Sequence, residues 1–173
     1  MQPLRPLRPL LHGVRGRPRG APVSRGDTVA TELSATSGHV ARPHTADVIV
    51  EAWAPTRMAC LEELVRGVVA TFAHVGSAQA TREVPLEVNA QVDEDLVIAL
   101  LDDVLYLLDA DGLVVVDVEL EEDEVDGSVE GLFRVTPVER VVATGAPPKG
   151  ASRSGLSFLP ENAAWRARVV LDV

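Results

Sequence analysis

The stretch DVIVEAWAPTRMACLEELVRGVVATFAHV, residues 47–75, changes its hydrophobic period part-way along. Apolar and polar residues alternate up to Trp53, a pattern typical of a half-buried strand. After Pro55, apolar residues recur at three- and four-residue steps, which predicts a helix with one apolar face and with Thr56 as its N-cap. This strand is expected to begin near Val40, and its inward face is expected to carry Val48, Val50 and Ala52.

The rest of the chain repeats this change once and then contains mainly strand patterns. A strand is expected over 83–91, and a second amphipathic helix, capped by Asp93, leads to the turn DADG at 109–112. Further strand patterns cover 113–121, 128–135, 138–143, 156–159 and 165–173, and TGAPPKGASRSG (144–155) is interpreted as a loop. Early helices and late strands predict an α+β fold in two layers, with two helices packed on one face of a mixed or antiparallel sheet.

Charge divides the chain into two parts. Residues 1–40 carry six arginines against Asp27 and Glu32, a net charge of +4, whereas residues 41–173 carry ten Lys or Arg against 24 Asp or Glu, a net charge of −14. Nucleic-acid affinity depends largely on Lys and Arg, so we expect no direct nucleic-acid binding by the folded domain. A basic protein partner or a cation is the natural complement of such a surface.

The first 38 residues differ in composition from the remainder. They repeat Pro-Leu-Arg, are rich in Pro, Gly and Arg, and lack the apolar core of a secretory signal. We expect 1–38 to be a disordered basic tail, or a segment upstream of the true start, and 39–173 to be a single domain. The single cysteine and the lack of a long apolar run indicate a reduced, cytoplasmic protein that does not span a membrane.

Familiar catalytic motifs are not found in the sequence. It contains no P-loop, no nucleophile elbow and no H-E-x-x-H helix, and Cys60 falls on the predicted helix, where a buried structural thiol is the simpler interpretation. Asp47 opens the first strand and Asp172 is the penultimate residue, followed by Val173. If the first and last strands are neighbours, these acidic groups converge and favour a hard divalent cation. The alternative is two separate surface aspartates.

Several motifs together resemble the archease family. The segment HTADVIVEAWAPTRMACLEELVRGVVATF (44–72) resembles the family's N-terminal signature, and DEDLVIALLDDVLYLLDADG (93–112) resembles its second helix. KGASRSGLSF (149–158) is similar to the family's lysine motif, and VVLDV (169–173) matches its closing strand. The resemblance covers residues 39–173 in the right order and implies an α+β archease fold.

The resemblance also implies a function and a site. Archeases are non-enzymatic proteins that activate the GTP-dependent RNA ligase of tRNA splicing and RNA repair, promoting its guanylylation and turnover. By resemblance, Asp47, Asp172 and a main-chain oxygen of Val173 would bind calcium, and Lys149 would be the activating lysine. His44 is expected to contribute at the partner contact or to orient Asp47 through a hydrogen bond.

The lysine motif departs from the family pattern. Lys149 is followed by Gly150, Ala151 and Ser152, where the family has Val-Thr-Tyr-His, and the segment upstream is shortened. Lys149 is therefore either the activating lysine or an ordinary loop lysine. Two other functions stay open: a chaperone-like or structural interaction module without ligase activation, and a metal-dependent hydrolase, for which no positioned base or nucleophile is found.

Overall fold

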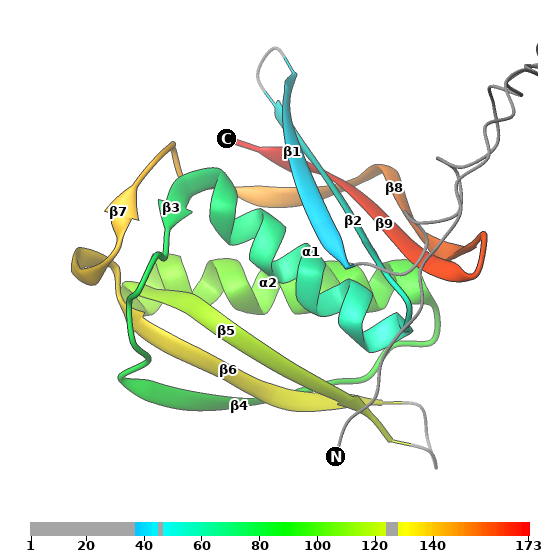
Figure 1. Ribbon diagram of the computed structural model, residues 1–173, viewed down its shortest axis with the longest axis horizontal. Coiled ribbons are helices and arrows are strands. Elements are labelled where there is room, and N and C mark those ends of the chain that lie inside the picture. The colour runs from blue at the N-terminus through cyan, green and yellow to red at the C-terminus, as the bar shows by residue number, and fades with distance from the viewer. Residues whose placement is uncertain (1–36, 45–46, 124–127) are drawn as a thin grey trace, which may run out of the picture. The chain divides into compact units, whose positions relative to one another are not determined.

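Antiparallel sheets enclose two helices in the computed structural model, which describes residues 37–44, 47–123 and 128–173 (Figure 1). The α+β class predicted from the sequence is confirmed. The elements are β1 (Gly38–His44), β2 (Asp47–Ala54), α1 (Arg57–Phe72), β3 (Ala73–His74), β4 (Arg82–Val88), α2 (Asp93–Asp111), β5 (Leu113–Glu122), β6 (Val129–Pro137), a 3₁₀ turn (Val138–Arg140), β7 (Val142–Ala143), β8 (Gly150–Glu161) and β9 (Ala164–Asp172).

The four-stranded sheet joins the beginning and the end of the described chain. Its strand order is β1-β2-β9-β8, with every pairing antiparallel, so β2 and β9 are the central strands. The strand expected from Val40 to Trp53 is in fact two strands, because His44 pairs with Asp47 across a reversal of the chain. The reversal was not predicted, because apolar and polar residues alternate along the sequence on both sides of it. Pro43, which has no N–H to donate, lies on the edge strand β1, where a proline is tolerated.

Two smaller sheets complete the pairing of the described strands. A three-stranded sheet has the order β4-β6-β5, and β3 pairs with β7 over two residues. The layering therefore differs from the expected two layers: α1 and α2 lie between the four-stranded and three-stranded sheets rather than on a single sheet (Figure 1). α1 contacts both β2 and β5, and α2 contacts both β8 and β5. Buried residues occupy half of α1, a wide apolar surface that one sheet cannot cover.

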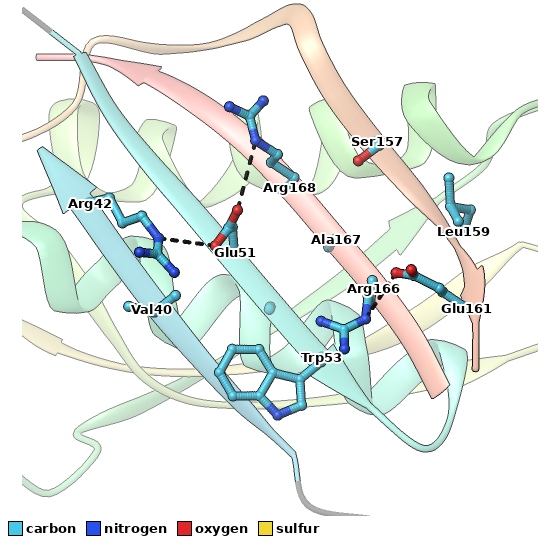
Figure 2. Close-up of a pocket in the computed structure, with 11 residues that line it drawn as sticks. Val40, Arg42, Glu51, Trp53, Ser157, Leu159, Glu161, Arg166, Ala167 and Arg168 are labelled. Carbon is cyan, nitrogen blue, oxygen red and sulfur yellow. Dashed lines mark hydrogen bonds and ion pairs between the residues drawn. The ribbon is translucent and has the colours of Figure 1, made fainter. Parts of the chain in front are cut away.

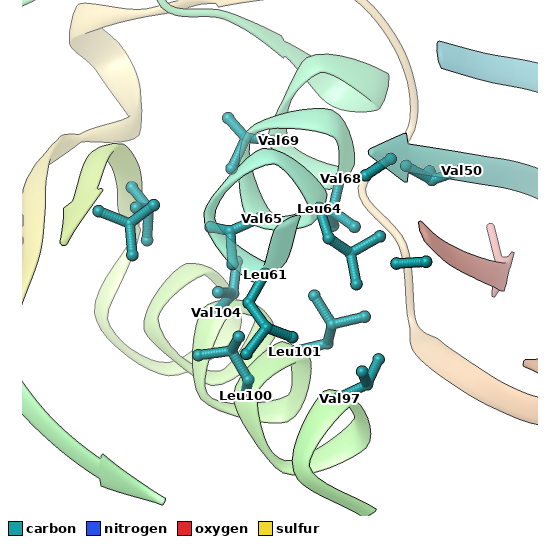
Figure 3. Packing of buried hydrophobic residues seen from close by; sticks show 14 of the residues in the cluster. Val50, Leu61, Leu64, Val65, Val68, Val69, Val97, Leu100, Leu101 and Val104 are labelled. Carbon is teal, nitrogen blue, oxygen red and sulfur yellow. The ribbon is translucent and has the colours of Figure 1, made fainter. Parts of the chain in front are cut away.

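The core lies between the helices and the two main sheets, and Figure 3 shows part of it. Leu61, Leu64 and Val68 of α1 pack with Val97, Leu100 and Leu101 of α2, and all six are at most 1% exposed. Gly67 permits α1 to lie close to the sheet, because a Cβ there would lie 2.8 Å from Val50 Cγ1. The predicted inward face of the first strand is confirmed at Val50 and Ala52, which are both buried.

The helix ends show one confirmed cap and one correction. The Thr56 side chain accepts a hydrogen bond from the Ala59 amide at 3.2 Å, as predicted for an N-cap. Asp93, however, is the first helical residue of α2 rather than its cap, a position held by Val92 without a side-chain hydrogen bond. The Asp93 carboxylate instead accepts a hydrogen bond from Arg57 at 2.5 Å. Gly112 ends α2 with φ of 63°, as expected for the turn at 109–112.

The segment interpreted as a loop at 144–155 is partly strand. β8 begins at Gly150, and residues 150–152 pair with residues 170–172 of β9. The register then shifts between Ser152 and Ser157, which bulges the strand. Gly, Ser and Arg have little β propensity of their own, so this strand depends on its partner β9.

Residues 1–36, 45–46 and 124–127 lie outside those described. The predicted disordered tail falls almost entirely on residues 1–36, and it stays a prediction. The first described strand begins at Gly38, and the predicted domain boundary between residues 38 and 39 also stays a prediction. Within the described residues, none of the helices has the length and apolar character that crossing a membrane requires.

Candidate functional site

Asp47 and Asp172 are directly opposite each other at one end of the four-stranded sheet. They are partners in the β2–β9 register, and Asp172 is also the partner of Gly150 in β8. Residues directly opposite in antiparallel strands have side chains on the same face, with Cβ atoms about 4.5–5.5 Å apart. β2, the second half of the expected first strand, is therefore the neighbour of the last strand β9, and the two aspartates are adjacent rather than separate.

Lys149 and Val173 lie at the same end of the sheet. The Lys149 amide donates a hydrogen bond to the Asp172 carbonyl at 2.7 Å, and its ammonium donates one to the Val173 main-chain oxygen at 3.2 Å. Both contacts continue the β8–β9 pairing by one residue. The structure thus brings together four of the residues predicted for the site: Asp47, Asp172, Val173 and Lys149.

A shallow hollow of about 370 Å³ lies beside the two carboxylates. Gly150 leaves room there, because a Cβ at this position would meet no heavy atom within 4 Å. The hollow is lined by Asp47, Gly150, Ala151, Ser152, Val170 and Asp172. Ser152, which supplies a hydroxyl to this hollow, was not among the predicted site residues, because the segment was interpreted as a loop.

The donor atoms at this end of the sheet suit a hard divalent cation. Two carboxylates and a main-chain oxygen form an all-oxygen set, the kind preferred by calcium or magnesium. Like charges directly opposite in a sheet are unfavourable, and the carboxylates of Asp47 and Asp172 form no hydrogen bond or ion pair with other described residues. A bound cation would relieve that repulsion. Over residues 37–44, 47–123 and 128–173, no three His, Cys, Asp or Glu side chains cluster as metal ligands, so further ligands would be main-chain, water or partner oxygens.

For His44, the structure describes the backbone and not the side chain. It is the partner of Asp47 in the β1–β2 register, at the same end of the sheet as the other site residues. Its side chain lies outside the described residues, so its predicted role toward Asp47 stays a prediction.

A second hollow adjoins Lys149 on the side of α2. It measures about 610 Å³, and its lining includes Asp102, Tyr106 and Asp109 from α2 as well as Pro147 and Lys149. Tyr106 is 65% exposed, and it lines this hollow together with Asp102 and Asp109 of the same helix. No site residue was predicted on the second helix, although a large aromatic side chain between two acidic positions was a signal for this exposed face.

Cys60 has the properties of a structural thiol. It is fully buried, and its Sγ lies 3.7 Å from the Ala52 carbonyl oxygen as a weak hydrogen-bond donor. Burial is the main cause that raises the pKa of the Cys60 thiol to about 12. A thiol that stays protonated at neutral pH is a poor nucleophile, in agreement with the structural interpretation made from the sequence.

Comparison with known proteins now assigns the family. The model of the Archease protein family matches residues 40–173, which include every site residue named above. The chain belongs to the archease family. It is 42% identical over 138 residues to a probable archease of Mycobacterium tuberculosis, found in two strains, which covers 80% of this chain and 76% of the relative.

One solved structure shows the same fold. Protein 1598 of Methanobacterium thermoautotrophicum is similar in structure, with a TM-score of 0.66 at 18% identity, over 79% of this chain and 99% of that protein. An archease from Thermotoga maritima, described as a possible chaperone, matches with a TM-score of 0.49 at 17% identity, over 76% of this chain and 96% of that one. At 18% identity, the likeness to Protein 1598 shows the fold alone.

Proposed function

We propose that this archease is a non-enzymatic activator of a GTP-dependent RNA ligase in tRNA splicing or RNA repair, where it promotes ligase guanylylation. The observation that carries the proposal is the convergence of Asp47, Asp172, Lys149 and Val173 at one end of the four-stranded sheet. By resemblance, Asp47, Asp172 and Val173 would correspond to the family's metal site and Lys149 to its activating lysine. The net charge of −14 over residues 41–173 supports a protein partner rather than RNA as the direct contact.

The site residues have distinct proposed roles. Asp47, Asp172 and the main-chain oxygen of Val173 would hold a divalent cation, for which calcium is our proposal. When bound, the cation would neutralise the carboxylate pair and offer positive charge to phosphate oxygens of the partner's nucleotide. Lys149 is exposed, and its ammonium, held near Val173, provides a mobile positive charge at the rim of the site.

Ligase guanylylation, measured as covalent transfer of labelled GMP to the ligase, tests this proposal. We expect wild type to raise the initial rate and Asp47→Asn, Asp172→Asn and Lys149→Ala each to lose at least 10-fold of that stimulation. Glu87→Gln and Arg140→Ala are matched controls, because both side chains are exposed on elements away from the site, and they should stimulate as wild type does.

Two outcomes would count against the proposal. Equal stimulation by wild type and all three site variants would remove the site assignment. If the chain binds the ligase but never stimulates it, the protein is a chaperone-like or structural interaction module instead. Chelation separates the metal from the lysine: it should abolish wild-type stimulation and have no further effect on Asp47→Asn.

A further inference from the structure

The outer face of the four-stranded sheet, which points away from α1 and α2, carries an ordered pattern of side chains. The registers place residues in rows across β1, β2, β9 and β8. One row contains Gly38, Trp53, Arg166 and Leu159, and the next contains Val40, Glu51, Arg168 and Ser157. The carboxylate pair of the candidate site lies on this same face, six residues along β2 from Trp53, which corresponds to roughly 20 Å.

These rows line a hollow of about 680 Å³ (Figure 2). Its centre lies over the central strands β2 and β9, with Trp53 on one side and Leu159 of β8 on the other. Leu159 is 47% exposed, an unusual degree for a large apolar side chain on a sheet. Trp53 also has a structural role, since a Cβ at Gly38 would lie 2.7 Å from its indole ring, so the ring covers that glycine.

Among the described residues, two of the three arginines around this hollow, Arg42 and Arg166, have free terminal nitrogens, whereas Arg168 donates a hydrogen bond from Nη1 to the Gly155 carbonyl at 2.7 Å. Arg42 and Arg166 each contact a glutamate through Nε, at 3.2 Å to Glu51 and 3.0 Å to Glu161 respectively. Within the described residues, neither arginine forms a hydrogen bond or ion pair through its two terminal nitrogens. A guanidinium fork of this kind binds a carboxylate through two parallel hydrogen bonds.

The charge around the hollow opposes that of the chain as a whole. Three arginines meet two glutamates here, namely Arg42, Arg166 and Arg168 against Glu51 and Glu161. Over residues 41–173, by contrast, acidic residues outnumber basic ones by 24 to 10. An acidic segment would therefore be repelled from most of this surface and accepted at the hollow. Trp53 and the arginines also belong to two residue types that are enriched in protein-interaction hot spots.

We infer that this hollow is a docking site for an extended acidic segment of a protein partner. The inference rests on the proposed function only in assuming a protein partner, and it adds a binding surface separate from the activating site. Carboxylates of the segment bind the forks of Arg42 and Arg166, and an apolar side chain between them lies against Trp53 and Leu159. The two arginines lie two strands and four residues apart, roughly 16 Å, which an extended chain spans in about five residues.

Two glutamates, Glu51 and Glu161, make this hollow a better binding site for a peptide than for RNA. Glu51 shares its two oxygens between Arg42 at 3.2 Å and Arg168 at 3.9 Å, and Glu161 pairs with Arg166. A phosphate backbone, with one charge per nucleotide, would pass close to both glutamates. A peptide with two carboxylates placed at the free forks avoids them. RNA binding at this face is therefore the competing outcome of the test.

NMR of the full chain tests the inference through the indole signals of its two tryptophans, assigned with Trp165→Phe. The probe is an eight-residue peptide with two glutamates five positions apart and a leucine between them, titrated to 1 mM. We expect a saturable shift of the Trp53 indole signal. The same peptide with glutamines should bind at least 10-fold more weakly, and an eight-nucleotide oligouridine should leave the Trp53 signal in place.

The decisive variant is Arg42→Glu with Arg166→Glu, which should abolish the shift. Its matched control, Arg82→Glu with Arg140→Glu, makes the same change in net charge on other elements and should bind as wild type does. If the first pair lowers the melting temperature more than the control pair does, Arg42→Gln with Arg166→Gln replaces it. No shift at 1 mM, an equal shift in the two charge-reversed pairs, or stronger binding of oligouridine would each overturn the inference.

The ligase distinguishes failure of the docking site from failure of the proposed function. Charge reversal at Arg42 and Arg166 should raise the Kd for the ligase at least 10-fold and leave maximal guanylylation unchanged at saturation. Lys149→Ala should leave the Kd for the ligase unchanged and lower maximal guanylylation. If wild type stimulates no ligase, the proposed function fails, and the peptide titration still decides the docking site.

Discussion

The two faces of the four-stranded sheet are built from alternate residues of the same strands, yet they serve different purposes. On the face toward the helices, Val50, Val169 and Leu171 are fully buried. On the other face, their immediate neighbours include Glu51, Arg168 and Asp172, which carry charge and reach solvent. The inner face depends on volume and apolar character, whereas the outer face depends on which group lies opposite which. Neighbouring residues of β9 therefore have different roles: those on the inner face stabilise the fold, and those on the outer face supply charged groups.

Adjacent substitutions at the end of β9 make the strongest test of this separation. Leu171→Ala removes a fully buried side chain and should lower the free energy of unfolding by about 2–5 kcal/mol. Asp172→Asn, one residue later on the exposed face, should change it by less than about 0.5 kcal/mol in the presence of a chelator. Urea denaturation of both variants measures the difference. Equal losses would mean that the two faces do not differ in their contribution to folding.

The inner face is also the part that could be predicted from the sequence. Alternation placed Val50 and Ala52 on the inward face, where both are buried, because a period of two in a strand leaves only two possible orientations. The helical period of residues 58–72 identified α1 in the same way. The division into two sheets was not predicted, because periodicity reports which side of an element is buried and not how many surfaces cover it.

Calcium binding should connect the outer face to stability. If Asp47 and Asp172 hold the ion, calcium at 100 times its Kd stabilises the fold by about 2.7 kcal/mol, seen as a rise in melting temperature. Asp47→Asn should be insensitive to calcium. In chelator, Asp47→Asn should be more stable than wild type by a few tenths of a kcal/mol in the free energy of unfolding, because the variant removes repulsion between two adjacent carboxylates. Equal calcium responses in wild type and Asp47→Asn would contradict the assignment, and Glu87→Gln is the control.

The candidate site could be predicted only in part. Asp47 and Asp172 followed from their positions at strand ends together with the resemblance, and the β2–β9 register brings them together. The outer hollow was not predicted, because it depends on cross-strand neighbours such as Trp53 and Arg166, which are 113 positions apart in the numbering. The bulge in β8 could not be predicted from the sequence either, since it follows from pairing with β9 rather than from local residue preferences.

The ion pairs of Asp117 join three elements and should contribute to folding. Asp117 of β5 accepts hydrogen bonds from Arg66 of α1 at 3.2 Å and from Arg134 of β6 at 3.0 Å. Partial burial acts to raise the pKa of Asp117, but hydrogen bonds, chiefly from Arg66, outweigh it, and the net effect lowers the pKa. Asp117→Asn should therefore cost about 1 kcal/mol at pH 7.

That contribution should disappear in acid. A carboxyl group with a lowered pKa in the folded state stabilises the fold above its unfolded pKa of about 3.9, and it loses this effect as the pH falls through the folded value. The difference between wild type and Asp117→Asn should thus be constant above about pH 5 and shrink toward zero below pH 4. Urea titrations from pH 2 to pH 7 measure it. A difference that grows in acid would contradict the direction of the pKa change.

The smallest expected effect on stability lies at Leu159, and it makes the sharpest contrast with Leu171. Leu159→Ser alters a side chain that is already 47% exposed on the outer face, so the free energy of unfolding should change by less than about 0.5 kcal/mol. If the hollow docks an apolar side chain, the same substitution should nevertheless weaken binding of the acidic peptide several-fold. Leu171→Ala should show the reverse at temperatures where it remains folded, with lower stability and little change in affinity. A leucine lost from either face then affects only one of the two measurements, whereas a Leu159→Ser variant that binds normally would leave the outer face without an apolar contact to its partner.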